Sequence, residues 1–98
     1  MNKSELIEKI RALSGSIRER GVTSLAIFGS RARGDHRAES DLDIVVDFVP
    51  GSGFSLIQLC AVERIIEEQI GIPVQATTRS SMSPGFLRAI EHDAIQVL

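Results

Sequence analysis

The spacing of apolar and polar residues along the chain predicts a small domain of alternating helices and strands. Apolar side chains recur at intervals of three and four residues over 4–20 and 55–70, which is typical of helices that bury one face. Two short apolar runs, over 24–28 and 42–49, predict buried strands, and the second run is rich in β-branched residues. Residues 74–77 predict a third, shorter strand. Helices and strands in this order are expected to share one hydrophobic core.

The C-terminal part of the chain adds a helix and an edge strand. Ser83 suits the N-cap position of a helix, and Pro84 suits its first turn. The apolar face of that helix is expected to consist of Phe86, Leu87 and Ile90. Residues 94–98 are expected to form a strand at the edge of the sheet. The resulting order, α-β-β-α-β-α-β, predicts an α/β (α+β) fold with a small mixed β-sheet and helices mainly on one face.

Composition and charge restrict the class of protein. The 98 residues suit a single domain, which we place over residues 1–98. The net charge of −2 argues against a general affinity for nucleic acid, because that affinity favours strongly basic domains. No apolar run approaches the roughly 20 residues that span a membrane, so a cytoplasmic protein without membrane contact is expected. The single cysteine, Cys60, cannot form an internal disulfide and is expected to pack in the core.

The residues with the clearest chemical use lie between the first two strands. Gly29-Ser30 follows the first strand, and Asp41 and Asp43 stand at the head of the second. A Gly-Ser turn lets the backbone approach a phosphate, with N–H groups and a hydroxyl as donors. Carboxylates on alternate residues of a strand point to one face, where they can share a hard cation. Alternatively, the Gly-Ser pair is an ordinary turn, Asp41 caps a turn, and Asp43 pairs with a nearby arginine.

The order of these motifs resembles that of the minimal nucleotidyltransferase (MNT) domains of prokaryotes, which belong to the DNA polymerase β-like nucleotidyltransferase superfamily. The strongest segment is 25–48, which contains Gly29-Ser30-Arg31-Ala32-Arg33-Gly34 and Ser40-Asp41-Leu42-Asp43-Ile44. The resemblance implies the nucleotidyltransferase fold, with ATP as a substrate. It also implies that Asp41 and Asp43 are catalytic residues that bind Mg²⁺. In the same way, it implies that Gly29 and Ser30 hold the β- and γ-phosphates.

Three polar residues close to these motifs each fit more than one role. Arg31 and Arg33 are placed to meet phosphate charge or to brace the two carboxylates, and a solvated loop position suits them equally. Arg31 is the stronger candidate for phosphate, because it follows the Gly-Ser turn directly. Ser40 either orients the carboxylate of Asp41 through a hydrogen bond or caps the turn. We therefore include Arg31, Arg33 and Ser40 among the candidate nucleotide-binding residues.

The chain departs from the resembled superfamily on its third strand. Active members of the superfamily usually carry a third carboxylate there, which helps to hold a second metal ion and to deprotonate the attacking hydroxyl. The matching stretch here is Val-Gln-Ala-Thr, which puts Gln75 at that position. Glutamine is a neutral and weaker ligand and cannot act as a general base. No Asp or Glu lies between Gln69 and Phe86, so a shifted alignment does not restore the carboxylate.

The resemblance leaves alternative functions open. In the first, the chain is an enzyme that moves AMP from ATP to a hydroxyl of a partner protein, and the expected partner is a helical HEPN-type toxin for which this chain is the antitoxin. In the second, the chain is a weak or inactive module of the same fold that neutralises its partner by contact. In the third, it is a degenerate domain without a nucleotide site. No direct contact with nucleic acid is expected, and the terminal edge strand could pair copies of the chain into a homo-oligomer.

Overall fold

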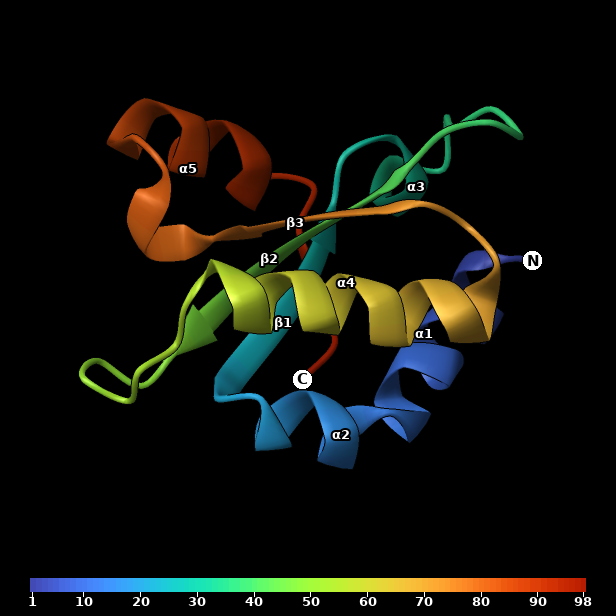
Figure 1. Ribbon diagram of the computed structural model, residues 1–98. Coiled ribbons are helices and arrows are strands. Elements are labelled where there is room, and N and C mark those ends of the chain that lie inside the picture. Colours follow the sequence, from blue (N-terminus) through green and yellow to red (C-terminus); the bar gives the residue numbers. More distant parts are fainter.

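The structure is a computed structural model that describes all 98 residues, and it is built around one four-stranded sheet (Figure 1). The strands are β1 (Val22–Phe28), β2 (Leu42–Phe48), β3 (Val74–Thr78) and β4 (Ile95–Gln96), in the spatial order β3-β2-β1-β4. β1 runs antiparallel to β2 and β4, whereas β2 and β3 are parallel, so the sheet is mixed as predicted. The C-terminal segment supplies the expected edge strand.

Most of the helices cover one face of the sheet, which confirms the prediction. They are α1 (Lys3–Ala12), α2 (Ser14–Glu19) and α4 (Leu56–Ile70), and α5 (Pro84–Glu91) lies on the opposite face (Figure 1). Two further elements, α3 (Ser30–Arg33) and the 3₁₀-helix η1 (Arg79–Ser81), are too short to show in the apolar periodicity of the sequence. None of the helices is long and apolar enough to cross a membrane.

The single helix predicted over 4–20 is in fact two helices that meet at Leu13. The backbone of Leu13 has φ −95° and ψ 6°, outside the helical range. Its N–H donates to the carbonyl of Ile10 at 2.9 Å, which makes a tighter turn than an α-helix. Residues 14–16, Ser-Gly-Ser, are weak helix formers and favour the break. The bend lets α1 bury Ile10 and α2 bury Ile17 against the same core.

The sheet separates a large core from a small one. The large core lies between the sheet and α1, α2 and α4, and its sheet residues include Leu25, Ile27, Ile44 and Val46. The small core, on the opposite face, consists of Ala26, Phe28, Val45 and Ile90. Because side chains alternate along β2, Asp43 and Asp47 share the face of the small core. Both aspartates are partly exposed there.

The predicted helix over 55–70 forms as α4, but its buried stripe is narrower than expected. Val62, Ile66 and Ile70 are buried. Cys60 is exposed, so its expected place in the core is wrong. Two residues turn an α-helix by about 200°, which points Cys60 away from the side on which Val62 is buried.

Two carboxylates of α4 secure the outer edge of β3. Glu63 accepts a hydrogen bond from the N–H of Ala76 at 2.7 Å, and Glu67 accepts one from the N–H of Val74 at 2.8 Å. β3 is an edge strand, so no further strand pairs with its outer side, and these bonds satisfy two of its backbone N–H groups. They also hold β3, which carries Gln75, in place beside β2.

Candidate functional site

The candidate site forms where β1 ends against the start of β2. In the antiparallel pair, Phe28 lies opposite Asp43, so the following Gly29 turns directly over that aspartate. A Cβ atom on Gly29 would lie 2.5 Å from Oδ2 of Asp43, and the backbone of Gly29 has a φ of +77°. Both facts require glycine at this position. Strand pairing therefore joins the two motifs that the sequence keeps apart.

A short helix replaces the arginine-rich loop that the sequence suggests. Gly29 is the N-cap of α3, Ser30 is its first residue, and Gly34 ends it in the left-handed conformation with φ 87°. The first N–H groups of a helix lack carbonyl partners within the helix. The Gly-Ser turn therefore starts a helix, with its free backbone donors, directly after the glycine that lies against Asp43.

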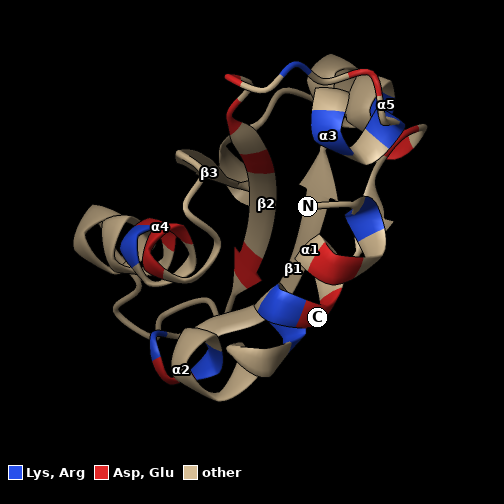
Figure 2. Ribbon diagram, turned by 90° about the vertical axis from the view of Figure 1, so that its right-hand side faces the viewer, with Lys and Arg blue, Asp and Glu red and all other residues tan.

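The two predicted carboxylates lie in one electrostatic environment. Partial burial raises the pKa of Asp43 above its ordinary value, and the negative charge of Asp41 raises it further, while Arg33 acts in the opposite direction. Figure 2 shows the acidic positions along β2 and the basic residues on neighbouring α3. A cation at this site would remove the cost that burial and repulsion impose on the ionised carboxylates.

The donor set fits one hard cation rather than two. No group of three His, Cys, Asp or Glu side chains in the structure could hold a metal ion. Asp41 and Asp43 alone can supply two oxygen ligands. Mg²⁺ typically takes one or two protein carboxylates and completes its shell with water and substrate phosphates. The residues present therefore fit a magnesium ion that is bound together with a nucleotide.

Arg31 is directed at the loop before β2. Its side chain is only 7% exposed, an unusual position for a charged group. Nε donates to the carbonyl of Ser40 at 2.9 Å, and a terminal nitrogen donates to the carbonyl of Ala38 at 3.3 Å. Of the roles considered for Arg31, these contacts fit bracing, because they fix the segment that leads into Asp41.

Arg33 and Ser40 also have partners within the chain. Arg33 is exposed and forms ion pairs with Asp35 at 3.1 Å and with Asp93 at 3.5 Å. The hydrogen bond to Asp35 and its charge, together with the charge of Asp93, raise the pKa of Arg33. The hydroxyl of Ser40 accepts a hydrogen bond from the N–H of Arg37 at 2.9 Å, which matches the turn-capping alternative.

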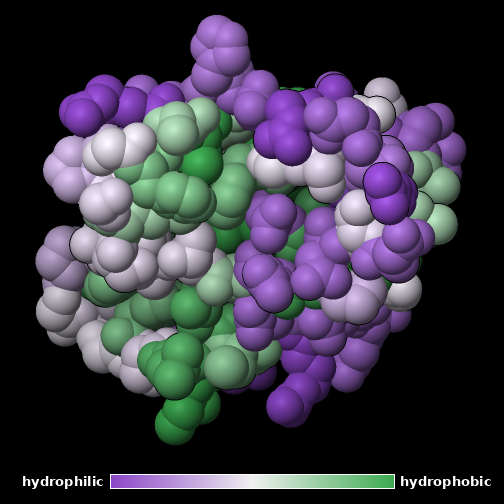
Figure 3. All heavy atoms as spheres, turned by 90° about the horizontal axis from the view of Figure 1, so that it is seen from above, coloured by the Kyte–Doolittle hydropathy of each residue, from purple (hydrophilic) through white to green (hydrophobic).

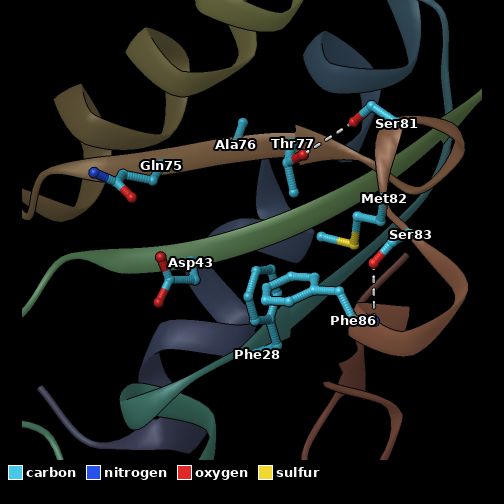
Figure 4. A pocket seen from close by; sticks show the side chains of 9 residues that line it. All are labelled: Phe28, Asp43, Gln75, Ala76, Thr77, Ser81, Met82, Ser83 and Phe86. Carbon is cyan, nitrogen blue, oxygen red and sulfur yellow. Dashed lines mark hydrogen bonds between the residues drawn. The ribbon is translucent and has the colours of Figure 1, made fainter. Parts of the chain in front are cut away.

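Gln75 lies where the sequence analysis expects it. In the parallel pairing of β2 and β3, Gln75 is the register partner of Asp43. Figure 4 shows the two side chains on neighbouring strands. The site therefore has an amide where a third carboxylate would stand.

A cavity of about 610 Å³ opens beside Asp43, and the sequence analysis did not identify it. Its lining consists of Phe28, Asp43, Gln75, Ala76, Thr77, Ser81, Met82, Ser83 and Phe86 (Figure 4). Phe86 was expected on the buried face of its helix, yet its side chain is 48% exposed. The only hint in the sequence was an aromatic residue in the first turn of a predicted helix.

The raised pKa of Asp43 leads to a test of stability against pH. Its folded pKa lies above its unfolded value, so the free energy of unfolding falls as pH rises through that interval. Without divalent cations, Asp43→Asn should have a higher Tm than the wild type at pH 7. The difference should vanish at about pH 3, where the aspartate is neutral in both states.

Asp47→Asn is the matched control for this thermal-unfolding series. Asp47 lies on the same strand face but accepts hydrogen bonds from Ser24 and Arg79, so removing its charge should lower Tm at pH 7. A Tm of Asp43→Asn equal to or below that of the wild type at pH 7 would contradict the electrostatic account.

Comparison with known sequences agrees with this geometry. Residues 5–97 match the family described as the nucleotidyltransferase domain. A protein of Methanocaldococcus jannaschii that is named as a candidate protein adenylyltransferase, MJ0435, is 36% identical over 98 residues, which is 100% of both chains. The protein adenylyltransferase MntA of Thermococcus cleftensis is 34% identical over 97 residues, covering 95% of this chain and 94% of the relative.

Solved structures share the fold. One that is described as a candidate minimal nucleotidyltransferase has a TM-score of 0.82 and 26% identity, and the match covers 97% of this chain and 95% of that one. The complex of a tri-AMPylated HEPN toxin with an MNT antitoxin from Shewanella oneidensis contains a chain with a TM-score of 0.65 over 94% of this chain and 71% of that one. At 14% identity, this second likeness shows the fold alone. The match over nearly the whole sequence and the shared fold show that the chain belongs to the nucleotidyltransferase domain family, as a minimal nucleotidyltransferase.

Proposed function

We propose that this chain is a magnesium-dependent nucleotidyltransferase that moves AMP from ATP to a hydroxyl of a partner protein. The observation that carries the proposal is the contact of Gly29 with Asp43, because it joins the phosphate-binding turn to the paired carboxylates. Both relatives are named as protein adenylyltransferases, and this supports a protein as the acceptor. The AMPylated HEPN toxin in complex with an MNT antitoxin supports a HEPN-type toxin as the partner and an antitoxin role for this chain.

The residues of the chain position the nucleotide in this proposal. Asp41 and Asp43 would hold the magnesium ion, which supplies positive charge that neutralises phosphate oxygens. The Ser30 hydroxyl and the first N–H groups of α3 donate to the β- and γ-phosphates. Arg31 keeps the loop before Asp41 in place. The oxygen of the partner hydroxyl forms a new bond to the α-phosphorus as its proton passes to water, while the bond to the leaving pyrophosphate breaks.

Gln75 supports a second candidate function, in which the chain neutralises its partner by binding alone. The amide of Gln75 is neutral and cannot accept the proton of the attacking hydroxyl. With two carboxylates the site lacks the donor set of a two-metal centre. A chain that keeps the fold but has lost fast transfer could still hold a partner in an inactive complex.

The transfer of label from ATP labelled at the α-phosphate separates the two functions. With the wild-type chain and Mg²⁺, label should appear on a HEPN-type partner protein. Asp43→Asn should reduce labelling at least about 100-fold, because it removes a metal-binding charge. Co-elution of the two proteins in gel filtration should survive the substitution. A stable complex with no label on the partner would instead support neutralisation by binding.

Restoring the missing carboxylate gives an independent test of Gln75. In the same assay with saturating Mg²⁺, Gln75→Asp should raise the initial rate of label transfer about tenfold or more, because it adds a general base and a metal ligand. Gln69→Asp is the control, since it makes the same substitution at an exposed position of α4, outside the site. An unchanged rate in Gln75→Asp, or an equal rise in both variants, would show that the absent carboxylate does not limit the reaction.

A further inference from the structure

Apart from Asp43 and Gln75, the residues that line the cavity beside Asp43 have no role in the phosphate and metal contacts described above. It lies on the sheet face that carries α5, and it is bounded by residues of β2, β3, η1 and α5 (Figure 4). Its volume of about 610 Å³ falls in the range of small-molecule sites. Because Asp43 forms part of the wall, a nucleotide whose phosphates are bound at Asp41 and Asp43 would have its nucleoside within reach of this cavity.

The chemistry of the lining does not suit phosphate. Apart from Asp43, no ionisable side chain lines the cavity, and no lysine or arginine does so. One part of the wall is aromatic and apolar, formed by Phe28, Met82 and Phe86, and the polar remainder includes the hydroxyls of Thr77, Ser81 and Ser83. Such a lining fits a flat, largely apolar ring with polar atoms at its edges.

The surface of the molecule divides in the same way. Figure 3 shows the face that carries α5 and α3. Hydrophobic residues gather over the left half of this view, which carries α5 and the start of α4, while hydrophilic residues gather over the half that carries α3 and the loop after it. The Gly-Ser turn, which begins α3, therefore lies on the hydrophilic side of this face.

The aromatic wall is held in place before any ligand binds. The rings of Phe28 and Phe86 meet edge to face, with centroids 6.2 Å apart and an angle of 86° between the planes. The N–H of Phe86 donates to the Ser83 hydroxyl at 3.2 Å, which fixes the first turn of α5. Yet 48% of the Phe86 side chain remains exposed, which is unusual for a large apolar residue placed in this way.

We propose that the nucleoside part of the bound nucleotide occupies this cavity, with its base stacked on Phe86 and its polar edges toward the hydroxyls of the wall. This inference rests on the proposed function, because that function brings the α-phosphate to Asp43. A nucleoside is favoured over a side chain of the partner protein, since the cavity is concave, preformed and of small-molecule size within a single chain. Stacking of a base on an aromatic side chain contributes about 1–3 kcal/mol by alanine substitution.

Calorimetric titration with two probes tests the assignment. The probes are ATP and inorganic tripolyphosphate, both with Mg²⁺, and only ATP carries a base. Phe86→Ala should weaken ATP binding by roughly 5-fold to 150-fold and leave the affinity for tripolyphosphate unchanged. Phe86→Trp should keep the affinity for ATP. Ile57→Ala is the control, because Ile57 is apolar, 79% exposed and outside the cavity.

The outcomes separate this inference from the proposed function. Loss of affinity for both probes in a folded Phe86→Ala, or unchanged affinity for ATP, would overturn the nucleoside assignment alone. Unchanged ATP affinity with loss of the partner complex would overturn it as well and assign the cavity to the partner. If the wild type binds neither probe, the proposed function fails and the assignment fails with it. Thermal unfolding of each variant checks that the fold is intact.

Discussion

The close contact between Gly29 and the carboxylate of Asp43 is the constraint on which the site depends. It exists because β1 and β2 pair with Phe28 opposite Asp43 and because the next residue has no side chain. The neighbouring pair in the same register, Ile27 and Ile44, is fully buried in the large core. Core packing thus sets the register, and the register sets the distance between the Gly-Ser turn and the carboxylates.

This arrangement has an electrostatic cost that the chain limits elsewhere. Partial burial and the charge of Asp41 both raise the pKa of Asp43, so the ionised site is destabilising without a cation. A carboxylate at the position of Gln75 would add a third negative charge beside Asp43. The glutamine therefore lowers the repulsion within the site and at the same time removes a general base. Glutamine at this position favours the stability of the metal-free protein, whereas a carboxylate there would favour fast transfer of AMP.

The sequence predicts the features that depend on local pattern, and misses those that depend on how elements meet. The two apolar runs predict β1 and β2, although β1 begins at Val22, two residues before its predicted start. The Gly-Ser and Asp-x-Asp motifs lie at the end of β1 and the head of β2, as expected. The break at Leu13 was missed because the apolar period continues across it. The bracing contacts of Arg31 depend on the path of the loop to Ser40, which no local pattern encodes. The exposure of Phe86 depends on how much of the sheet α5 covers, so the cavity could not be predicted from the sequence alone.

Magnesium-dependent ATP binding by Gly29→Ala tests whether the Gly-Ser turn and the paired carboxylates form one site. The added methyl group would collide with Asp43 and strain the backbone, whereas Gly15→Ala meets no atom within 4 Å and serves as the control. Gly29→Ala should lose the magnesium-dependent affinity for ATP in titration calorimetry while circular dichroism shows its secondary structure retained, and Gly15→Ala should keep that affinity. Binding of ATP and Mg²⁺ by Gly29→Ala with wild-type affinity would contradict a single site built from the turn and the carboxylates.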